Sequence, residues 1–225
     1  EEGRNLAAYR FSLHEDRIAP GGWVEIATPA ANRILYCVEG SLGVGGGSLG
    51  DLVPLERDEA RLAIGLTRLE TGHTGALVLR WELTPAEQQE ELEEAGVTSG
   101  LLMERTIELP EEEERLMRLD AVALTPGASD PSHIIPGPSL RVLANGAVSV
   151  ALGDQTTPHR PGGAWFVKEG EEASVSADDT APALTFRAAI LPTSLKGESA
   201  IFYAEKGEGD GPPRARVYVD REILL

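Results

Sequence analysis

Cysteine, basic residues and long apolar runs are all scarce in this sequence, and each scarcity excludes a class of protein. Cys37 is the only cysteine, so an intrachain disulfide and a cysteine-rich zinc site are both excluded. Lysine and arginine together number 20, against 37 acidic residues, and the formal net charge is -17. Because binding to a phosphate backbone needs a basic face, DNA and RNA are not expected partners.

Membrane and nucleotide signatures are also missing. No run approaches the roughly 18 consecutive apolar residues that cross a bilayer, so no membrane partner is expected. The first residues, EEGRN, lack a signal-peptide pattern, and together with the single cysteine this favours a cytoplasmic location. The glycine-rich run at 45–48 lacks the Lys-Ser/Thr of a P-loop, and no nucleophile elbow occurs in a strand-to-helix setting.

The composition that remains is that of a folded, turn-rich protein. Hydrophobic residues make up 41% and charged residues 25%, as in ordinary globular proteins. Glycine (25) and proline (15) recur between short apolar runs, a pattern typical of all-β folds with many turns. We therefore expect an all-β protein.

The chain contains an internal repeat. The segment 18–44 aligns with 124–150 at one offset of 106 residues, without a gap and with four identical positions. Each copy gives a Pro-Gly turn, a polar segment, a strand-like run, a glycine turn and a second strand-like run. A later match, 75–80 with 182–187, falls at an offset of 107. These matches predict two copies of one β-rich unit.

A helix is expected between the copies. Thr84, Pro85 and Glu87 form an N-terminal capping pattern, and Gly96 closes the segment. The predicted helix covers about 85–95. The expected domains are therefore an N-terminal barrel at 1–83, a helical linker at 84–100 and a C-terminal barrel at 101–225.

Two motif-like segments lie in the second copy. The first is PGASDPSH, which ends at His133 and is followed by Gly146, and the second runs from Leu152-Gly153 to PGGAWFVKEG at 161–170. Together with the repeat, these segments resemble the two motifs of the tandem cupins, or bicupins, over nearly the whole chain. The resemblance implies two double-stranded β-helix barrels of the jelly-roll-like, RmlC-like superfamily, and association as a homodimer.

The cupin metal shell is largely replaced. His133 stands at the first ligand position of the second copy, but Ile135, Ser139 and Ala173 stand at the other three. The matching positions of the first copy are Ala27, Pro29 and Arg33. Since a transition metal needs three or four converging donors, we expect no cofactor. A divalent metal held by an unconventional set, such as His133 with His159 and acidic side chains, is kept as an alternative.

The replaced positions suggest a different chemistry. If the former glutamate position faces the barrel interior, strand alternation places further residues inside: Arg33, Leu35 and Cys37 in the first copy, and Ser139, Arg141 and Leu143 in the second. A buried guanidinium needs an anion, and its planar fork suits a carboxylate or phosphate. The sharper hypothesis is an anion-recognising pocket, with Arg141, Ser139 and His133 as its candidates in the second copy and Arg33 in the place of the metal-binding carboxylate in the first. The simpler one is that the arginines pair with internal Asp or Glu, or reach the rim.

Two functions are carried forward. The first is a bicupin that binds a small molecule, an organic acid, and acts without metal or with an atypical one as an isomerase, lyase or hydrolase. In this function Arg141 holds the carboxylate and the catalytic candidate His133 moves a proton. The second is a non-catalytic ligand-binding or structural bicupin. Arg80 and Arg187 occupy equivalent places, which favours a shared structural role, and Glu82 is the expected partner of Arg80.

Overall fold

The computed structural model describes residues 5–46, 51–88, 91–111, 113–203 and 215–225. They belong to two compact units, Glu1–Glu113 with Leu225 and Glu114–Leu224, called here unit 1 and unit 2. Every strand pairing within them is antiparallel. The one helix in these ranges is the single 3-10 turn η1 (Thr193–Leu195), and no helix of the described chain could cross a membrane.

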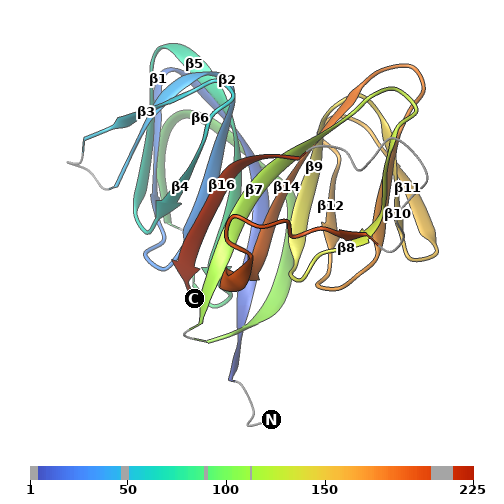
Figure 1. Ribbon diagram of the computed structural model, residues 1–225. Coiled ribbons are helices and arrows are strands. Elements are labelled where there is room, and N and C mark those ends of the chain that lie inside the picture. The colour runs from blue at the N-terminus through green and yellow to red at the C-terminus, as the bar shows by residue number, and fades with distance from the viewer. Residues whose placement is uncertain (1–4, 47–50, 89–90, 112, 204–214) are drawn as a thin grey trace. The chain divides into compact units, whose positions relative to one another are not determined.

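Unit 1 is built from four long strands and two short ones (Figure 1). They are β1 (Leu6–Ala27), β2 (Asn32–Gly45), β3 (Val53–Glu56), β4 (Ala60–Ile64), β5 (Thr67–Pro85) and β6 (Glu91–Pro110). The sheet order is β3-β2-β5-β1-β6, and β4 also pairs with β2. Because β4 pairs with the first half of β2 and β3 with its second half, each long strand serves both sides of the barrel.

Unit 2 repeats this plan with each long strand divided in two. Its sheets have the orders β11-β10-β13-β8-β15 and β12-β9-β14-β7-β16, so β9 and β10 replace β2, and β13 and β14 replace β5. The strands are β7 (Glu114–Leu124), β8 (Ser129–Ile134), β9 (Ser139–Asn145), β10 (Val148–Leu152), β11 (Gln155–His159), β12 (Ala164–Val167), β13 (Ala173–Ala177), β14 (Ala183–Pro192), β15 (Phe202–Tyr203) and β16 (Ala215–Leu224). The two tandem β-barrels expected from the repeat are confirmed.

Matched glycines show why the two copies share a turn. Gly40 and Gly146, which the repeat aligns, both have left-handed backbone angles, with φ of 75° and 83°. A Cβ atom at Gly40 would lie 2.0 Å from the carbonyl oxygen of Gly75, and one at Gly146 would lie 2.5 Å from that of Pro182. Only glycine satisfies both demands, so this sequence signal has a direct steric cause.

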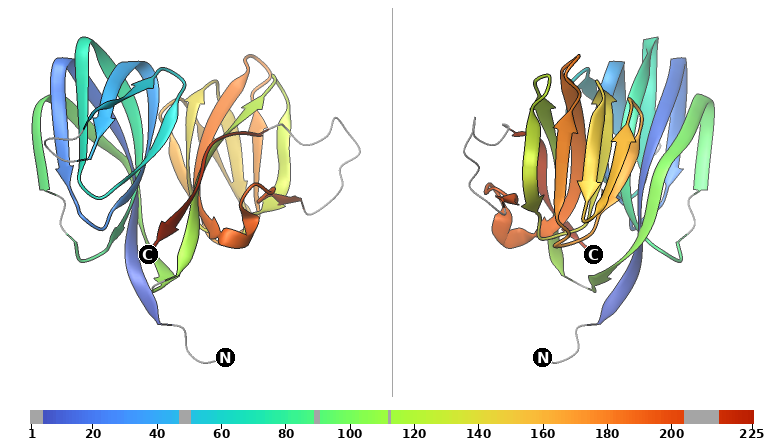
Figure 2. Two further views of the ribbon diagram at one scale, coloured as in Figure 1. Left: turned by 60° about the vertical axis from the view of Figure 1, so that its left-hand side comes forward. Right: turned by 90° about the vertical axis from the view of Figure 1, so that its right-hand side faces the viewer.

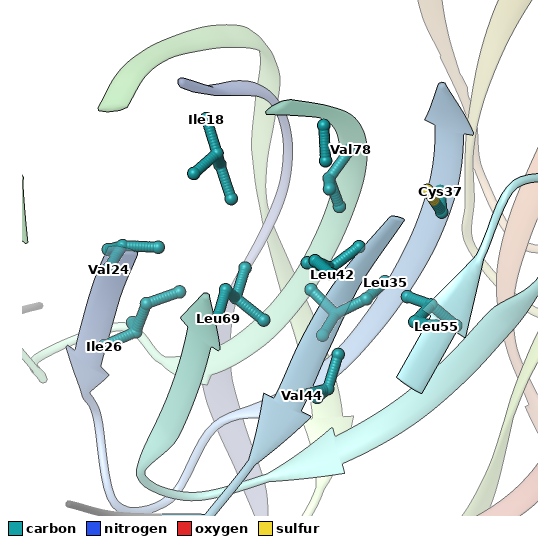
Figure 3. Packing of buried hydrophobic residues seen from close by; sticks show 11 residues of the cluster. Ile18, Val24, Ile26, Leu35, Cys37, Leu42, Val44, Leu55, Leu69 and Val78 are labelled. Atoms are coloured by element: carbon teal, nitrogen blue, oxygen red, sulfur yellow. The ribbon is translucent and has the colours of Figure 1, made fainter. Parts of the chain in front are cut away.

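An apolar core fills one end of each barrel. In unit 1, Leu35 and Cys37 of β2 point into a cluster with Leu42, Val44 and Leu69 (Figure 3). The corresponding cluster of unit 2 includes Leu143, Val150 and Trp165. In both units the strands curve around this core, as the two views of Figure 2 show. The polar interior residues lie on the same strands, further along.

The helix predicted for residues 85–95 is wrong. Strand β5 continues to Pro85, and β6 begins at Glu91 and pairs with β1 over nearly its whole length, from Ala27–Glu91 to Leu6–Pro110. Gly96 does have a left-handed φ of 69°, but it lies opposite the register shift of β1 rather than at a helix end. The long pairing with β1 overrides the local capping pattern. Consequently the described residues of 84–100 contain no helical linker, and the chain divides into its two compact units at Glu113 and Glu114.

Candidate functional site

Strand alternation places the predicted arginines inside their barrels. Arg33 lies two residues before Leu35, which belongs to the unit 1 core, and Arg141 lies two residues before Leu143 of the unit 2 core. Their exposed fractions are 0% and 3%. Both guanidinium groups are therefore removed from water, and each needs compensation from within its own unit.

In unit 1 the compensating charges are carboxylates of the same unit. Arg33 donates through Nε to Glu82 on the neighbouring strand, and Arg80 donates to the other oxygen of Glu82. Arg80 Nε also donates to Asp16 Oδ2 over 2.6 Å, and the hydroxyl of Ser99 donates to Asp16. Two cations thus meet two carboxylates, all buried, so Arg33 is part of a neutral ionic cluster. The predicted ion pair between Glu82 and Arg80 is present.

His14 borders this cluster on β1. Its Nε2 atom lies 3.9 Å from Glu82 Oε2 and 3.1 Å from the hydroxyl of Ser12. Burial, reinforced by the positive charge of Arg80, lowers the pKa of His14 to about 4 against the opposing pull of Glu82. The ring is accordingly neutral near pH 7. His14 lies within the long strand β1, beside the strand that carries Arg80 and Glu82.

The interior of unit 2 is compensated differently. Arg187 donates to Asp120 Oδ2 over 2.7 Å, which is the structural role expected from its match with Arg80. Arg141 donates to Ser139 Oγ through Nε and to His133 Nε2 through Nη1, both over 3.3 Å. Within the described chain, Arg141 has no ion pair with a carboxylate and its buried Nη2 has no hydrogen-bond partner.

The strand registers explain this difference. In unit 1 Arg33 stands opposite Glu82, whereas the corresponding pair in unit 2 is Ser139 and Ala189. The unit 2 arginine occurs two residues later, where it stands opposite Arg187. Directly opposed side chains share one face of a sheet, and like charges in that position repel. Burial and Arg187 together lower the pKa of Arg141 to about 9, although Asp130 and Asp120 act in the opposite direction.

His133 is fully buried beside this cation, and its partners define its tautomer. Nδ1 lies 2.8 Å from the carbonyl oxygen of Pro131, which can only accept, so Nδ1 carries the proton. Nε2 faces Arg141 Nη1, which can only donate, so Nε2 presents its lone pair. Burial lowers the pKa of His133; Asp130 opposes this shift and Arg141 adds to it. The imidazole is therefore neutral at pH 7.

A pocket of about 450 Å³ reaches this polar layer. It is lined by Asp120, Arg187 and Tyr203, together with segment 197–201 and parts of β7 and β16. Tyr203 donates to Asp130 Oδ1 over 3.2 Å and packs edge-on against the ring of His133. Arg118 holds the segment in place by donating to the carbonyl oxygens of Leu195 and Glu198. The pocket thus adjoins both Arg187 and the His133 environment.

The residues around His133 do not fit a transition metal. Ile135 and Ala173 are apolar and buried, Ser139 Oγ is engaged by Arg141, and the lone pair of His133 faces a cation. His159 lies on β11 and packs against Trp165. Over the residues that the structure describes, no three His, Cys, Asp or Glu side chains converge.

Sequence reasoning named His133, Ser139 and Arg141, which the structure brings together, and Arg33, which lies in the other unit. It missed Asp120, Asp130 and Tyr203. A usable signal existed for Asp120, because extending the 106-residue offset a few residues before the aligned segments pairs it with His14. Tyr203 carried no such signal, since it reaches His133 through the two-residue strand β15.

Comparison with known proteins shows the fold alone. No protein-family model and no curated protein sequence matches the chain. A deletion mutant of Bacillus subtilis oxalate decarboxylase matches 79% of this chain and 68% of its own, with a TM-score of 0.61 and 12% identity. The 11S allergen of Cocos nucifera matches 84% and 85%, with a TM-score of 0.60 and 11% identity. AerE from Microcystis aeruginosa matches 80% and 88%, with a TM-score of 0.61 and 11% identity.

Proposed function

The chain has the bicupin fold, which an oxalate decarboxylase shares with an 11S allergen, and on that premise we propose that unit 2 binds a small organic anion. Arg141 is the proposed anion-binding group, Ser139 orients its guanidinium, and His133 supplies a neutral ring nitrogen for proton exchange beside it. No cofactor takes part in this proposal. The proposed anion enters through the pocket at Asp120, Arg187 and Tyr203.

One observation carries the proposal: Arg141 is a buried cation that lacks a contacting carboxylate within the described chain. The other buried arginines act as internal controls. Arg33, Arg80, Arg118 and Arg187 each have at least one carboxylate in direct contact. A guanidinium in a low-dielectric interior is stabilised strongly by a planar anion, so a bound carboxylate would give Arg141 what the other four already have.

A donor close in register supports the same site. Trp165 on β12 stands opposite Arg141, and its buried Nε1 also has no hydrogen-bond partner among the described residues. Indole N–H groups usually find an acceptor when buried. An anion near Arg141 Nη2 would supply acceptor oxygens for two buried donors, Arg141 Nη2 and Trp165 Nε1.

The second candidate function is that of a structural bicupin that catalyses no reaction, and the interior of unit 1 supports this candidate. The interior of unit 1 combines an apolar cluster with a neutral ionic cluster, and such a closed interior needs no ligand. We therefore assign the proposed binding function to unit 2 only. A cytoplasmic location and a homodimer stay proposals; light scattering coupled to size-exclusion chromatography tests the dimer.

Isothermal titration calorimetry of the full chain tests the anion site. Acetate, propanoate, malonate and succinate would be titrated at constant ionic strength, with sodium chloride as the reference. We expect saturable binding of at least one carboxylate that is lost in Arg141→Gln. Arg17→Gln is the matched control, because it removes the same charge from an exposed pair with Glu15. If no carboxylate binds, or if Arg141→Gln binds as the wild type does, the proposal is wrong.

A further inference from the structure

The interior of unit 2 has a further buried polar atom without a partner among the described residues, and this one is an acceptor. Asp120 is only 4% exposed. Its Oδ2 accepts from Arg187 over 2.7 Å, whereas its Oδ1 has no hydrogen-bond partner within the described residues. Leaving one carboxylate oxygen buried and unbonded is costly, so this atom needs a donor in the same way that Arg141 Nη2 needs an acceptor.

The two atoms belong to one layer of the barrel. Arg141 on β9 stands opposite Arg187 on β14, and Arg187 stands opposite Asp120 on β7. The three side chains therefore follow one another across adjacent strands on the interior face. Neighbouring strands lie about 4.8 Å apart, so the backbones of β9 and β7 are roughly 10 Å apart, and a small molecule placed between the side chains of Arg141 and Asp120 could contact both. Asp120 and Arg187 also line the pocket.

We infer that the ligand of unit 2 combines a carboxylate with an adjacent hydrogen-bond donor, as in a 2-hydroxy acid or a 2-amino acid. The carboxylate binds Arg141, and the hydroxyl or ammonium group donates to Asp120 Oδ1. This inference rests on the proposed anion site and adds its specificity. A plain carboxylate would satisfy Arg141 but leave Asp120 Oδ1 unbonded, and a 2-keto acid would set an acceptor against it.

The alternative occupant is water. A water molecule with several polar neighbours could bridge Arg141 Nη2 and Asp120 Oδ1. In that case Asp120 has a donor already, and an organic ligand gains nothing from a hydroxyl group. The two explanations therefore differ in whether the donor on the ligand increases its affinity.

A matched series of acids with a three-carbon backbone tests the inference on the wild-type protein by calorimetry. Propanoate lacks a donor, lactate and alanine carry one, pyruvate carries an acceptor, and 2-methoxypropanoate keeps the oxygen of lactate but loses its proton. We expect lactate or alanine to bind about tenfold or more tightly than the other three, because a hydrogen bond to a buried charged group is worth that factor. If 2-methoxypropanoate or pyruvate binds as tightly as the tighter-binding of lactate and alanine, the inference is overturned.

The failure of the inference can be told apart from the failure of the proposed function. If all five acids bind equally and Arg141→Gln abolishes binding of each, the anion site stands and the donor preference is wrong, as expected for the bridging water. If none binds, the proposed function fails, and the inference with it.

Asp120→Asn gives a second readout on a nearly isosteric side chain. One amide atom can still accept from Arg187, and the other now donates instead of accepting. We expect the preference for lactate over pyruvate to disappear or reverse, while Arg17→Gln keeps the wild-type preference. Circular dichroism would verify that the variant is folded. A folded Asp120→Asn protein with an unchanged preference would show that the donor binds elsewhere and would overturn the inference.

Discussion

Replacing Arg141 with leucine should stabilise unit 2 in the absence of ligand. The matching position of unit 1 is Leu35, a fully buried core residue, so the fold accepts leucine there. Burial and the neighbouring Arg187 lower the pKa of Arg141 to about 9, and this shift corresponds to about 5 kcal/mol of unfavourable free energy for the charged form. The lost hydrogen bonds to Ser139 and His133 cost about 3 kcal/mol in return.

The net expectation for Arg141→Leu is a gain of about 2 kcal/mol, within the range of about 1 to 4 kcal/mol seen when apolar residues replace buried ions. For a domain of about 100 residues this raises Tm by roughly 10 °C. Differential scanning calorimetry after exhaustive dialysis measures the change. Hydrogen exchange in peptides from β9 and β14 would show whether the change belongs to unit 2.

The control is Arg187→Leu, on the neighbouring strand. Arg187 has a carboxylate partner in Asp120, so its removal leaves a buried charge without compensation and should destabilise unit 2 by about 3 to 5 kcal/mol. The two substitutions delete the same charge one strand apart but act in opposite directions. If Arg141→Leu destabilises the protein as much as Arg187→Leu does, Arg141 has a compensating partner and the reasoning behind the anion site is refuted.

Three further predictions concern unit 1. The pKa of His14 in the folded protein, about 4, lies below the ordinary value, so protonation of His14 should lower the free energy of unfolding by about 3 kcal/mol in total as pH falls from about 6.5 to 4. Urea titrations should show a smaller loss of unfolding free energy for His14→Gln, and the same loss as the wild type for the exposed His73→Gln. Burial raises the pKa of the Cys37 thiol to about 11, so a thiol reagent at pH 8 should react only after denaturation, and rapid native labelling would contradict this. Glu82→Gln leaves Arg33 and Arg80 partly uncompensated and should lower the unfolding free energy by about 3 kcal/mol or more, whereas an unchanged denaturant midpoint would show that the cluster does not stabilise unit 1.

The sequence predicted the duplication because the duplication has steric causes. Each copy has a proline-glycine turn and then a glycine, at 40 or 146. This glycine has a left-handed backbone angle, and a backbone oxygen lies where a Cβ atom would be. The turn and the glycine can both be recognised in the sequence without knowledge of the partner strand. The strand at 91–110 could not be recognised in this way. Its first half is rich in glutamate and follows a capping pattern, and only the register with β1 makes it a strand.

In the candidate site, too, the sequence predicts local properties but not those that depend on a partner strand. Alternation along one strand predicts that Arg33 and Arg141 face inward, because the direction of a side chain is a local property. Whether the arginine is compensated depends on the strand opposite: Glu82 stands across from Arg33, and Arg187 stands across from Arg141. A sequence repeat gives equivalent positions but not cross-strand partners, so it could not show that one barrel is neutral while the other keeps a cation without a contacting carboxylate.

This asymmetry links stability to binding in one measurable way. If Arg141 lowers the stability of unliganded unit 2, then an anion that compensates it must raise that stability, by RT ln(1 + [L]/Kd). At a ligand concentration one hundred times the dissociation constant, this amounts to about 2.7 kcal/mol, close to the gain expected from Arg141→Leu without ligand. Wild-type protein saturated with ligand and ligand-free Arg141→Leu should therefore melt at similar temperatures, and the variant should not respond to the ligand. A ligand that stabilises both proteins equally would bind outside the Arg141 layer.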